Sequence, residues 1–152
     1  MEKPNVKRTH IALYVRDPIA SGKWYEEVLG MEETARGEEW VFMSFGKKHH
    51  DIALIRTDET RPPIQRGLQH YGLEIGDDVT YLRRLYGMLL RKNVEVVKTT
   101  DHKIGYGLYF NDPDGNRLEF FCDLVFDDSE GKRLLHEYHA PSDPIDLKPL
   151  FD

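Results

Sequence analysis

Two histidines and one glutamate stand where they could hold a divalent metal ion. His10 opens the segment HIALYVRD, and His70 opens the similar segment HYGLEIGD, 60 positions further along (70 minus 10). Both segments have the pattern of a strand, so the two imidazoles occupy equivalent places in a weak internal repeat. Glu119 lies in a third strand-like segment, 117–123. Imidazoles and carboxylates are ligands that divalent transition metals accept.

Glu119 is expected to point into the interior. Successive strand residues face opposite sides, so Leu118, Phe120 and Cys122 share one face, which suits packing under a helix, and Glu119 lies on the other. An unpaired carboxylate would be costly to bury there, and a metal bound together with two imidazoles would offset that cost. Two His and one carboxylate form a facial triad with open positions, typical of non-heme Fe(II) oxygenases. Manganese, or zinc in a hydrolytic setting, suits the same ligands, and a single strand histidine could also be structural.

The elements that must position these residues repeat in the two halves of the chain. The first helix is expected to begin at Asp17, with Pro18 in its first turn, and to end at Gly30. The second is expected to begin after Asp77 or Asp78 and to stop at Asn93. Three short strands are expected after each helix, at 32–35, 40–46 and 51–56 in the first half and at 94–98, 105–110 and 117–123 in the second.

Each half is therefore predicted to be a βαβββ module, and the fold class to be α+β. One such module leaves a face of its sheet uncovered, so two are expected to form one cleft with the helices outside. Residues 1–123 are then a single domain, with modules of about 1–65 and 66–123, and residues 124–152 are a C-terminal extension. A short helix is predicted around Ser129–Tyr138.

Composition excludes several classes of protein. The net charge of -6 argues against a nucleic-acid binder, which would need a basic face. The apolar runs are far shorter than the ~20 residues of a membrane span. The short, polar segment Met1–Thr9 is not expected to be a signal or transit peptide. The single cysteine, Cys122, leaves no disulfide framework or thiolate cluster, so a reducing cytoplasm is the expected location.

The segments around His10 and His70, and the stretch LYFNDPDGNRLE at 108–119, resemble the vicinal oxygen chelate superfamily. The resemblance covers about residues 6–123. That superfamily contains glyoxalases, fosfomycin-resistance proteins, methylmalonyl-CoA epimerases, bleomycin-binding proteins and extradiol catechol dioxygenases. The DPDGN turn before a strand that carries Glu is a specific signal of the superfamily, although Pro113 and Gly115 also suit a tight hairpin. The resemblance further implies a homo-oligomer.

Three features are most similar to extradiol catechol dioxygenases. The segment HHDIAL at 49–54 resembles the one that carries their catalytic histidine, which makes His50 the acid–base candidate. Tyr109 lies ten positions before Glu119, as does the dioxygenase tyrosine that contacts the substrate. The segment DHK at 101–103 resembles the one with a further active-site histidine, here His102, although the spacing from His102 to Tyr109 is shorter than in the large two-domain enzymes.

The resemblance thus implies a ring-cleaving dioxygenase that acts on a catechol-like aromatic diol and O2. Fe(II) is the implied metal at His10, His70 and Glu119, with Mn(II) as the second choice. A histidine can take and return a proton near neutral pH, and a tyrosine can donate a hydrogen bond to a substrate oxygen. His50 could instead belong to an exposed hairpin, and Tyr109 could be ordinary strand packing.

Two other functions remain open on the same fold. Four-ligand members of the superfamily usually have a further ligand on the last strand of the first half, where Ala53 cannot coordinate and only Asp51 could. This departure weakens a glyoxalase or epimerase function. A lyase or thiol-transferring resistance enzyme would use the same three ligands, and the matches at His50 and Tyr109 favour the dioxygenase over it. A non-catalytic small-molecule-binding protein would not need the complete ligand set.

Overall fold

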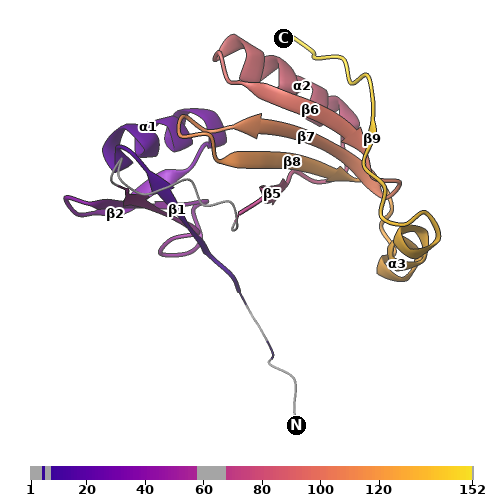
Figure 1. Ribbon diagram of the computed structural model, residues 1–152, viewed down its shortest axis with the longest axis horizontal. Coiled ribbons are helices and arrows are strands. Elements are labelled where there is room, and N and C mark those ends of the chain that lie inside the picture. The colour runs from indigo at the N-terminus through magenta and orange to yellow at the C-terminus, as the bar shows by residue number, and fades with distance from the viewer. Residues whose placement is uncertain (1–4, 6–7, 58–67, 152) are drawn as a thin grey trace. The chain divides into compact units, whose positions relative to one another are not determined.

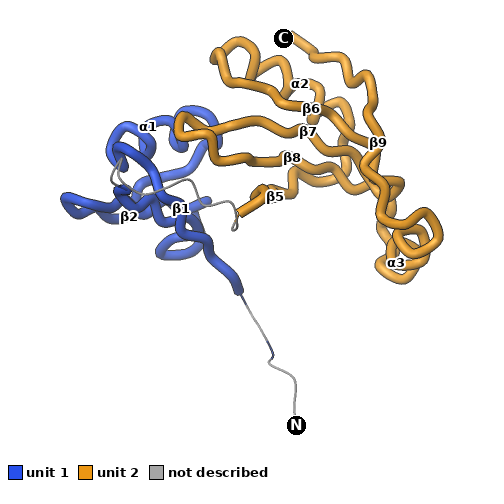
Figure 2. Tube along the Cα trace, in the orientation of Figure 1, with its two compact units in different colours: residues 1–66 blue, residues 67–152 orange. Residues whose placement is uncertain are grey.

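The computed structural model describes residues 5, 8–57 and 68–151. The chain forms two compact units, residues 1–66 and residues 67–152 (Figure 2). Each unit contains one sheet and at least one helix (Figure 1). The α+β class and the βαβββ order of the two halves are therefore confirmed, whereas the common cleft stays a prediction.

Unit 1 is a βαβββ module with a four-stranded sheet in the order β1-β4-β3-β2. Strand β1 runs parallel to β4, and the other pairs are antiparallel. Its helix begins where the sequence predicts, because Asp17 accepts hydrogen bonds from the backbone of Ile19 and Ala20 at 3.0 and 3.2 Å. The elements are β1 (Ile11–Val15), α1 (Pro18–Leu29), β2 (Glu32–Arg36), β3 (Trp40–Ser44) and β4 (Ile52–Arg56).

Unit 2 repeats this order and adds a fifth strand, giving the sheet β5-β8-β7-β6-β9. Strand β5 runs parallel to β8, and the remaining pairs are antiparallel. The elements are β5 (Tyr71–Glu74), α2 (Val79–Arg91), β6 (Val96–Asp101), β7 (Gly105–Asn111), β8 (Arg117–Asp123), α3 (Asp128–Glu137) and β9 (Asp143–Pro144). Strand β6 runs further than predicted, to Asp101, because β9 pairs with its end. The C-terminal extension thus supplies α3 and an edge strand.

The core of unit 2 lies between its sheet and α2. Leu118, Phe120 and Cys122 are buried, and α2 contacts β7 and β8. This confirms the predicted alternation along β8, which leaves Glu119 and Phe121 on the opposite face of the sheet. In the part of the chain that the structure describes, no helix is long and apolar enough to cross a bilayer.

The turn between β7 and β8 sets the register of the two strands that carry the candidate site. Asp112 is 5% exposed, and its carboxylate accepts bonds from the backbone N–H groups of Asp114 and Asn116 at 2.9 and 2.8 Å. The Asn116 amide donates a third bond to it at 2.9 Å. Gly115 supplies a positive φ of 81°. With this turn in place, Tyr109 lies opposite Glu119.

Replacing the central carboxylate of this turn is expected to destabilise the protein. Asp112→Ala removes three hydrogen bonds and leaves partly buried N–H groups without an acceptor, so the free energy of unfolding should fall by about 3 kcal/mol. Asp112→Asn keeps the shape and one acceptor oxygen and should cost clearly less. Urea unfolding of the two variants measures the difference. Equal stability of Asp112→Ala and the wild type would contradict this account of the turn.

Candidate functional site

A buried carboxylate lies at the centre of the candidate site in unit 2. In the sheet, Glu119 lies between Gly72 of β5 and Tyr109 of β7. Two glycines leave the space that its side chain fills. A Cβ atom at Gly107 would lie 2.4 Å from Glu119 Oε1, and one at Gly72 would lie 3.6 Å from Oε2. The strands are therefore shaped around this carboxylate.

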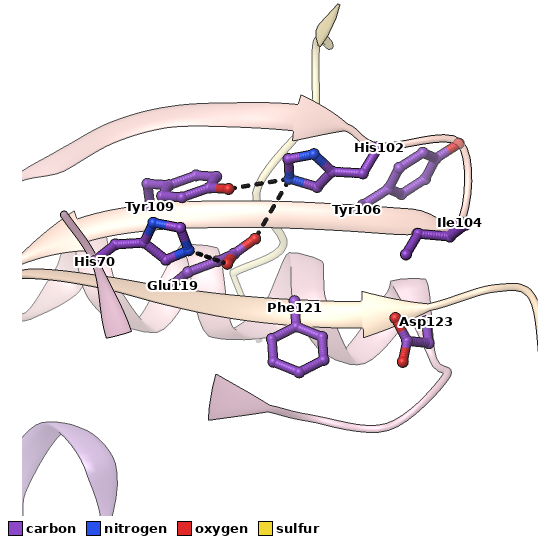
Figure 3. A pocket seen from close by; sticks show the side chains of 9 residues that line it. His70, His102, Ile104, Tyr106, Tyr109, Glu119, Phe121 and Asp123 are labelled. Atoms are coloured by element: carbon purple, nitrogen blue, oxygen red, sulfur yellow. Dashed lines mark hydrogen bonds and ion pairs between the residues drawn. The ribbon is translucent and has the colours of Figure 1, made fainter. Parts of the chain in front are cut away.

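Two imidazoles flank the Glu119 carboxylate, which is only 6% exposed (Figure 3). His70 Nε2 lies 3.1 Å from Oε2, and His102 Nε2 lies 3.5 Å from Oε1. His70 Nδ1 is hydrogen bonded to the Gln69 side-chain oxygen, so Nδ1 carries the proton. The lone pair of a neutral His70 imidazole then faces a carboxylate oxygen. Such a pair needs either one further proton between the ring and the carboxyl group or a cation bound by both groups.

His102 and Tyr109 meet beside this pair. The Tyr109 hydroxyl lies 3.0 Å from His102 Nε2, and the hydroxyl of the buried Thr100 lies 2.9 Å from the same nitrogen. Burial, followed by the negative charge of Glu119, raises the pKa of Tyr109 to about 12. The phenol therefore keeps its proton at neutral pH. The Lys98 ammonium lies 4.7 Å from the centre of the Tyr109 ring.

A pocket of about 410 Å³ opens over these side chains. His70, His102, Tyr109 and Glu119 make one part of its wall, and Ile104, Tyr106 and Phe121 make an aromatic and apolar part (Figure 3). Its volume is within the range of small-molecule sites. Asp123 lies two residues beyond Phe121 on β8 and also lines the pocket. A flat, largely apolar ligand with polar atoms at one end suits this lining.

His10 and His50 lie together in unit 1. Their ring centres are 4.9 Å apart, and the His50 ring stacks on Phe42 with centres 4.3 Å apart. Phe42 is half-buried, and its ring packs against the His50 ring. Burial, and then the positive charges of His49, His10 and Arg8, lower the pKa of His50 below its ordinary value.

The Asp51 carboxylate has two partners within unit 1. It lies 3.3 Å from the Arg8 guanidinium and accepts a hydrogen bond from the Phe45 N–H at 2.9 Å. These contacts hold the loop between β3 and β4, which carries His50. The side chain thus has a structural role, whereas its part as a fourth ligand stays open.

The metal triad stays a prediction. The structure brings His70 and Glu119 together in unit 2, whereas His10 belongs to unit 1. Among the residues described, no ready-made group of three or more His, Cys, Asp and Glu side chains could hold a metal ion. The two candidate ligands in unit 2 nevertheless fit a metal ion, because a buried carboxylate faces an imidazole whose other nitrogen already donates a hydrogen bond. That second bond is the usual way in which a metal-binding histidine is oriented.

Sequence reasoning missed three residues of the site. Thr100 lies two positions before His102, and the alternation of β6 could have indicated it. Gly107 could have been found from its place two residues before Tyr109 on the same face of β7. Pro141 accepts a hydrogen bond from His102 and lies 39 positions away in the extension, where no local pattern indicates a contact.

The comparisons with known proteins agree on one superfamily. A family model described as Glyoxalase/Bleomycin resistance protein/Dioxygenase superfamily matches residues 7–120. The chain is similar to biphenyl-2,3-diol 1,2-dioxygenase 2 of Rhodococcus globerulus, with 30% identity over 120 residues. That alignment covers 77% of this chain and 63% of the relative, so the chain spans less than two thirds of that protein's length.

Two further similarities bear on function and fold. Metallothiol transferase FosB of Lysinibacillus sphaericus is 27% identical over 132 residues, which cover 84% of this chain and 91% of that protein. The crystal structure of a glyoxylase/bleomycin resistance protein/dioxygenase domain from Frankia sp. EAN1pec has a TM-score of 0.62 and 26% identity. It is matched over 80% of this chain and 99% of that chain.

Proposed function

Because the chain belongs to the Glyoxalase/Bleomycin resistance protein/Dioxygenase superfamily, we propose that it is an Fe(II)-dependent extradiol dioxygenase. Its substrates would be a catechol-like aromatic diol and O2, and Mn(II) is the alternative metal. The superfamily is mostly enzymatic, and its members bind divalent metals. The observation that carries the proposal is the group of Glu119, His70, His102 and Tyr109 on one pocket wall, which joins a candidate metal pair to candidate proton-transfer groups.

His70 and Glu119, with His10 from the first half, would hold the metal. When bound, the ion would supply the coordination of the diol and the redox chemistry with oxygen. The protein's own part in binding it is to keep His70 oriented through Gln69 and to keep the Glu119 carboxylate in the space left by Gly107. A bound cation would also balance the charge of this buried carboxylate, which supports the choice of ligands.

Tyr109 and His102 would handle protons and hydrogen bonds at the substrate. Since the pKa of Tyr109 is raised to about 12, its hydroxyl is a donor at neutral pH, either to His102 Nε2 or to an oxygen of the diol. His102 can accept the phenol's hydrogen bond and provides a site for a proton from the diol. His50 would be the acid–base group contributed by unit 1.

The rest of the pocket supports an aromatic substrate. Ile104 and Phe121 offer apolar surface beside the polar group, and Tyr106 adds a further aromatic ring. Burying an aromatic ring against such side chains is favourable, whereas a small polar substrate would leave these apolar side chains exposed to water. We therefore expect diols with an apolar substituent to bind better than unsubstituted catechol.

The direct test is oxygen consumption. Protein reconstituted with Fe(II) without air, then mixed with oxygen and a panel of simple and biaryl catechols, should consume oxygen and form a yellow ring-cleaved product. Zn(II)-loaded protein is the control, because Zn(II) suits the ligands but has no redox chemistry. No oxygen uptake by iron-loaded wild type across the panel would reject the dioxygenase.

The second candidate is a metal-dependent lyase or thiol transferase. The similarity to a metallothiol transferase over 84% of this chain favours it as the alternative. Such an enzyme needs the metal but has no evident need for proton transfer between His102 and Tyr109. Thiol addition to an epoxide by Mn(II)-loaded protein, without oxygen uptake, would identify it. A protein that binds aromatic ligands equally well without metal would instead be a binding protein.

A further inference from the structure

We propose that the C-terminal extension positions His102, and that the backbone carbonyl of Pro141 fixes the tautomer of its imidazole. The carbonyl oxygen lies 2.9 Å from His102 Nδ1. Because a carbonyl can only accept, the proton must be on Nδ1. In the neutral ring Nε2 is then the acceptor. It faces the hydroxyls of Tyr109 and Thr100 at 3.0 and 2.9 Å, and Glu119 Oε1 lies 3.5 Å from it. The extension would thus decide that the nitrogen facing the pocket is the one without the proton.

The extension is held against the strand that leads to His102. Strand β9 pairs with the end of β6, with Thr100 opposite Pro144 and Asp101 opposite Asp143. Next to this pair, the Ile145 N–H donates to the Thr99 carbonyl at 3.2 Å, and the Thr99 hydroxyl donates back to the Ile145 carbonyl at 2.7 Å. The backbone around His102 and the group that bonds its ring are therefore fixed by the same segment.

The chain after β9 is anchored as well. Leu147 is buried, and the Leu150 N–H donates to the Arg83 carbonyl of α2 at 2.9 Å. Arg83 Nε donates in turn to the Lys148 carbonyl at 2.9 Å. Gly87 makes room for this segment, since a Cβ atom there would lie 1.9 Å from the Leu150 carbonyl oxygen. Figure 1 shows the segment running from α3 past β9 towards α2.

The approach to Pro141 is conformationally costly. His139 and Ala140 have φ values of 57° and 47°, in the left-handed region that non-glycine residues rarely adopt. They reverse the chain between α3 and β9 immediately before Pro141. Backbone strain of this kind persists where the surrounding structure over-determines it, and it is common next to functional groups. Here the two strained residues place the Pro141 carbonyl next to the His102 imidazole.

The catalytic meaning of this restraint rests on the proposed function, but the tautomer can be measured without activity. Long-range ¹H–¹⁵N spectra of full-length protein labelled with ¹⁵N-histidine should show a proton on His102 Nδ1, both without metal and with Zn(II). In the Zn(II)-loaded protein, where the metal balances the charge of Glu119, Nε2 should carry no proton. His102 protonated at Nε2 alone in the wild type would overturn the proposal, whatever the enzyme assays give. A fixed Nδ1–H tautomer in a protein that consumes no oxygen would leave the positioning intact and reject only the dioxygenase.

Two variants test whether the extension is the cause. A chain ending at Ala140 lacks the carbonyl and β9, and its His102 should change to a mixture of tautomers, with an unchanged affinity for Zn(II). A chain ending at Lys148 keeps Pro141 and β9 and should retain the Nδ1–H form. The wild-type tautomer in the chain ending at Ala140 would overturn the proposal.

If the shortened chain does not fold, a milder variant tests the role of the extension instead. Thr99→Val removes only the hydroxyl that bonds Ile145, so it should loosen the extension and raise the share of the Nε2–H tautomer. With iron bound, kcat should fall by about tenfold or less, with little change in KM. Thr80→Val, at an exposed position at the start of α2, is the matched control and should change neither. A Thr99→Val spectrum and kcat identical to those of Thr80→Val would contradict the role of the extension.

Discussion

Glu119→Gln is expected to lose bound metal almost completely without loss of the fold. The substitution keeps the side-chain shape in the space beside Gly72 and Gly107 but removes the negative charge. Loss of the partners that merely orient a ligand typically lowers metal affinity about 10- to 100-fold, so loss of a ligand should lower it by about 100-fold or more. His70→Ala and His10→Ala should lose metal as well. Iron content after reconstitution without air, measured per protein chain, tests this prediction.

The free energy of unfolding of the metal-free protein distinguishes a Glu119 that serves as a metal ligand from one that holds the fold together. In metal-free protein, Glu119 is a buried charge with imidazole partners, and its removal also removes a desolvation cost. We therefore expect the free energy of unfolding of metal-free Glu119→Gln to equal or exceed that of the metal-free wild type. Glu74→Gln, an exposed change on β5, is the matched control and should keep its metal. Full metal content in Glu119→Gln, or a large loss of stability without metal, would contradict the assignment.

The parts of the fold that the sequence predicted are those with local signals. Helix α1 begins at the Asp17 cap with Pro18 in its first turn and ends at Gly30, which has a φ of 67°. The Asp17 side chain bonds the backbone of its near neighbours, and Pro18 and Gly30 act through their own backbone angles. The alternation along β8 predicted that Glu119 lies on the face of the sheet opposite to the one that packs under a helix. Both patterns depend on neighbours in sequence, so a single chain is enough to detect them.

The parts that the sequence did not predict depend on contacts between distant backbone groups. Strand β9 has two residues, Asp143 and Pro144, and it pairs through backbone atoms, which residue type does not encode. The same applies to the Pro141 carbonyl, which any residue could have supplied. The candidate site was predicted by type and resemblance, at His70, Glu119 and Tyr109, but the contacts that orient those side chains required the structure.

His50→Gln is the prediction with the largest expected effect on turnover. His50 stacks on Phe42 and lies beside His10, and glutamine at this place can still form hydrogen bonds but cannot carry a proton at neutral pH. If His50 is the acid–base group, kcat should fall by about 10²- to 10⁴-fold, while iron content and catechol binding remain. Tyr109→Phe keeps the ring and loses only the hydroxyl, so a smaller loss is expected.

The pH profile adds a signature that a structural role would not produce. The pKa of His50 is lowered by burial and by the charges of His49, His10 and Arg8, and a cation at His10 would act in the same direction. A base works in its neutral form, which exists above its pKa, so the acid limb of the wild-type kcat profile should lie below the ordinary histidine value of 6.5. His50→Gln should abolish this limb. His49→Gln, at the exposed neighbour, should keep an acid limb, moved to higher pH because one of the charges that lower the pKa of His50 is removed. Iron-loaded His50→Gln with wild-type kcat at every pH would remove His50 from the mechanism and leave His102 as the proton-transfer group.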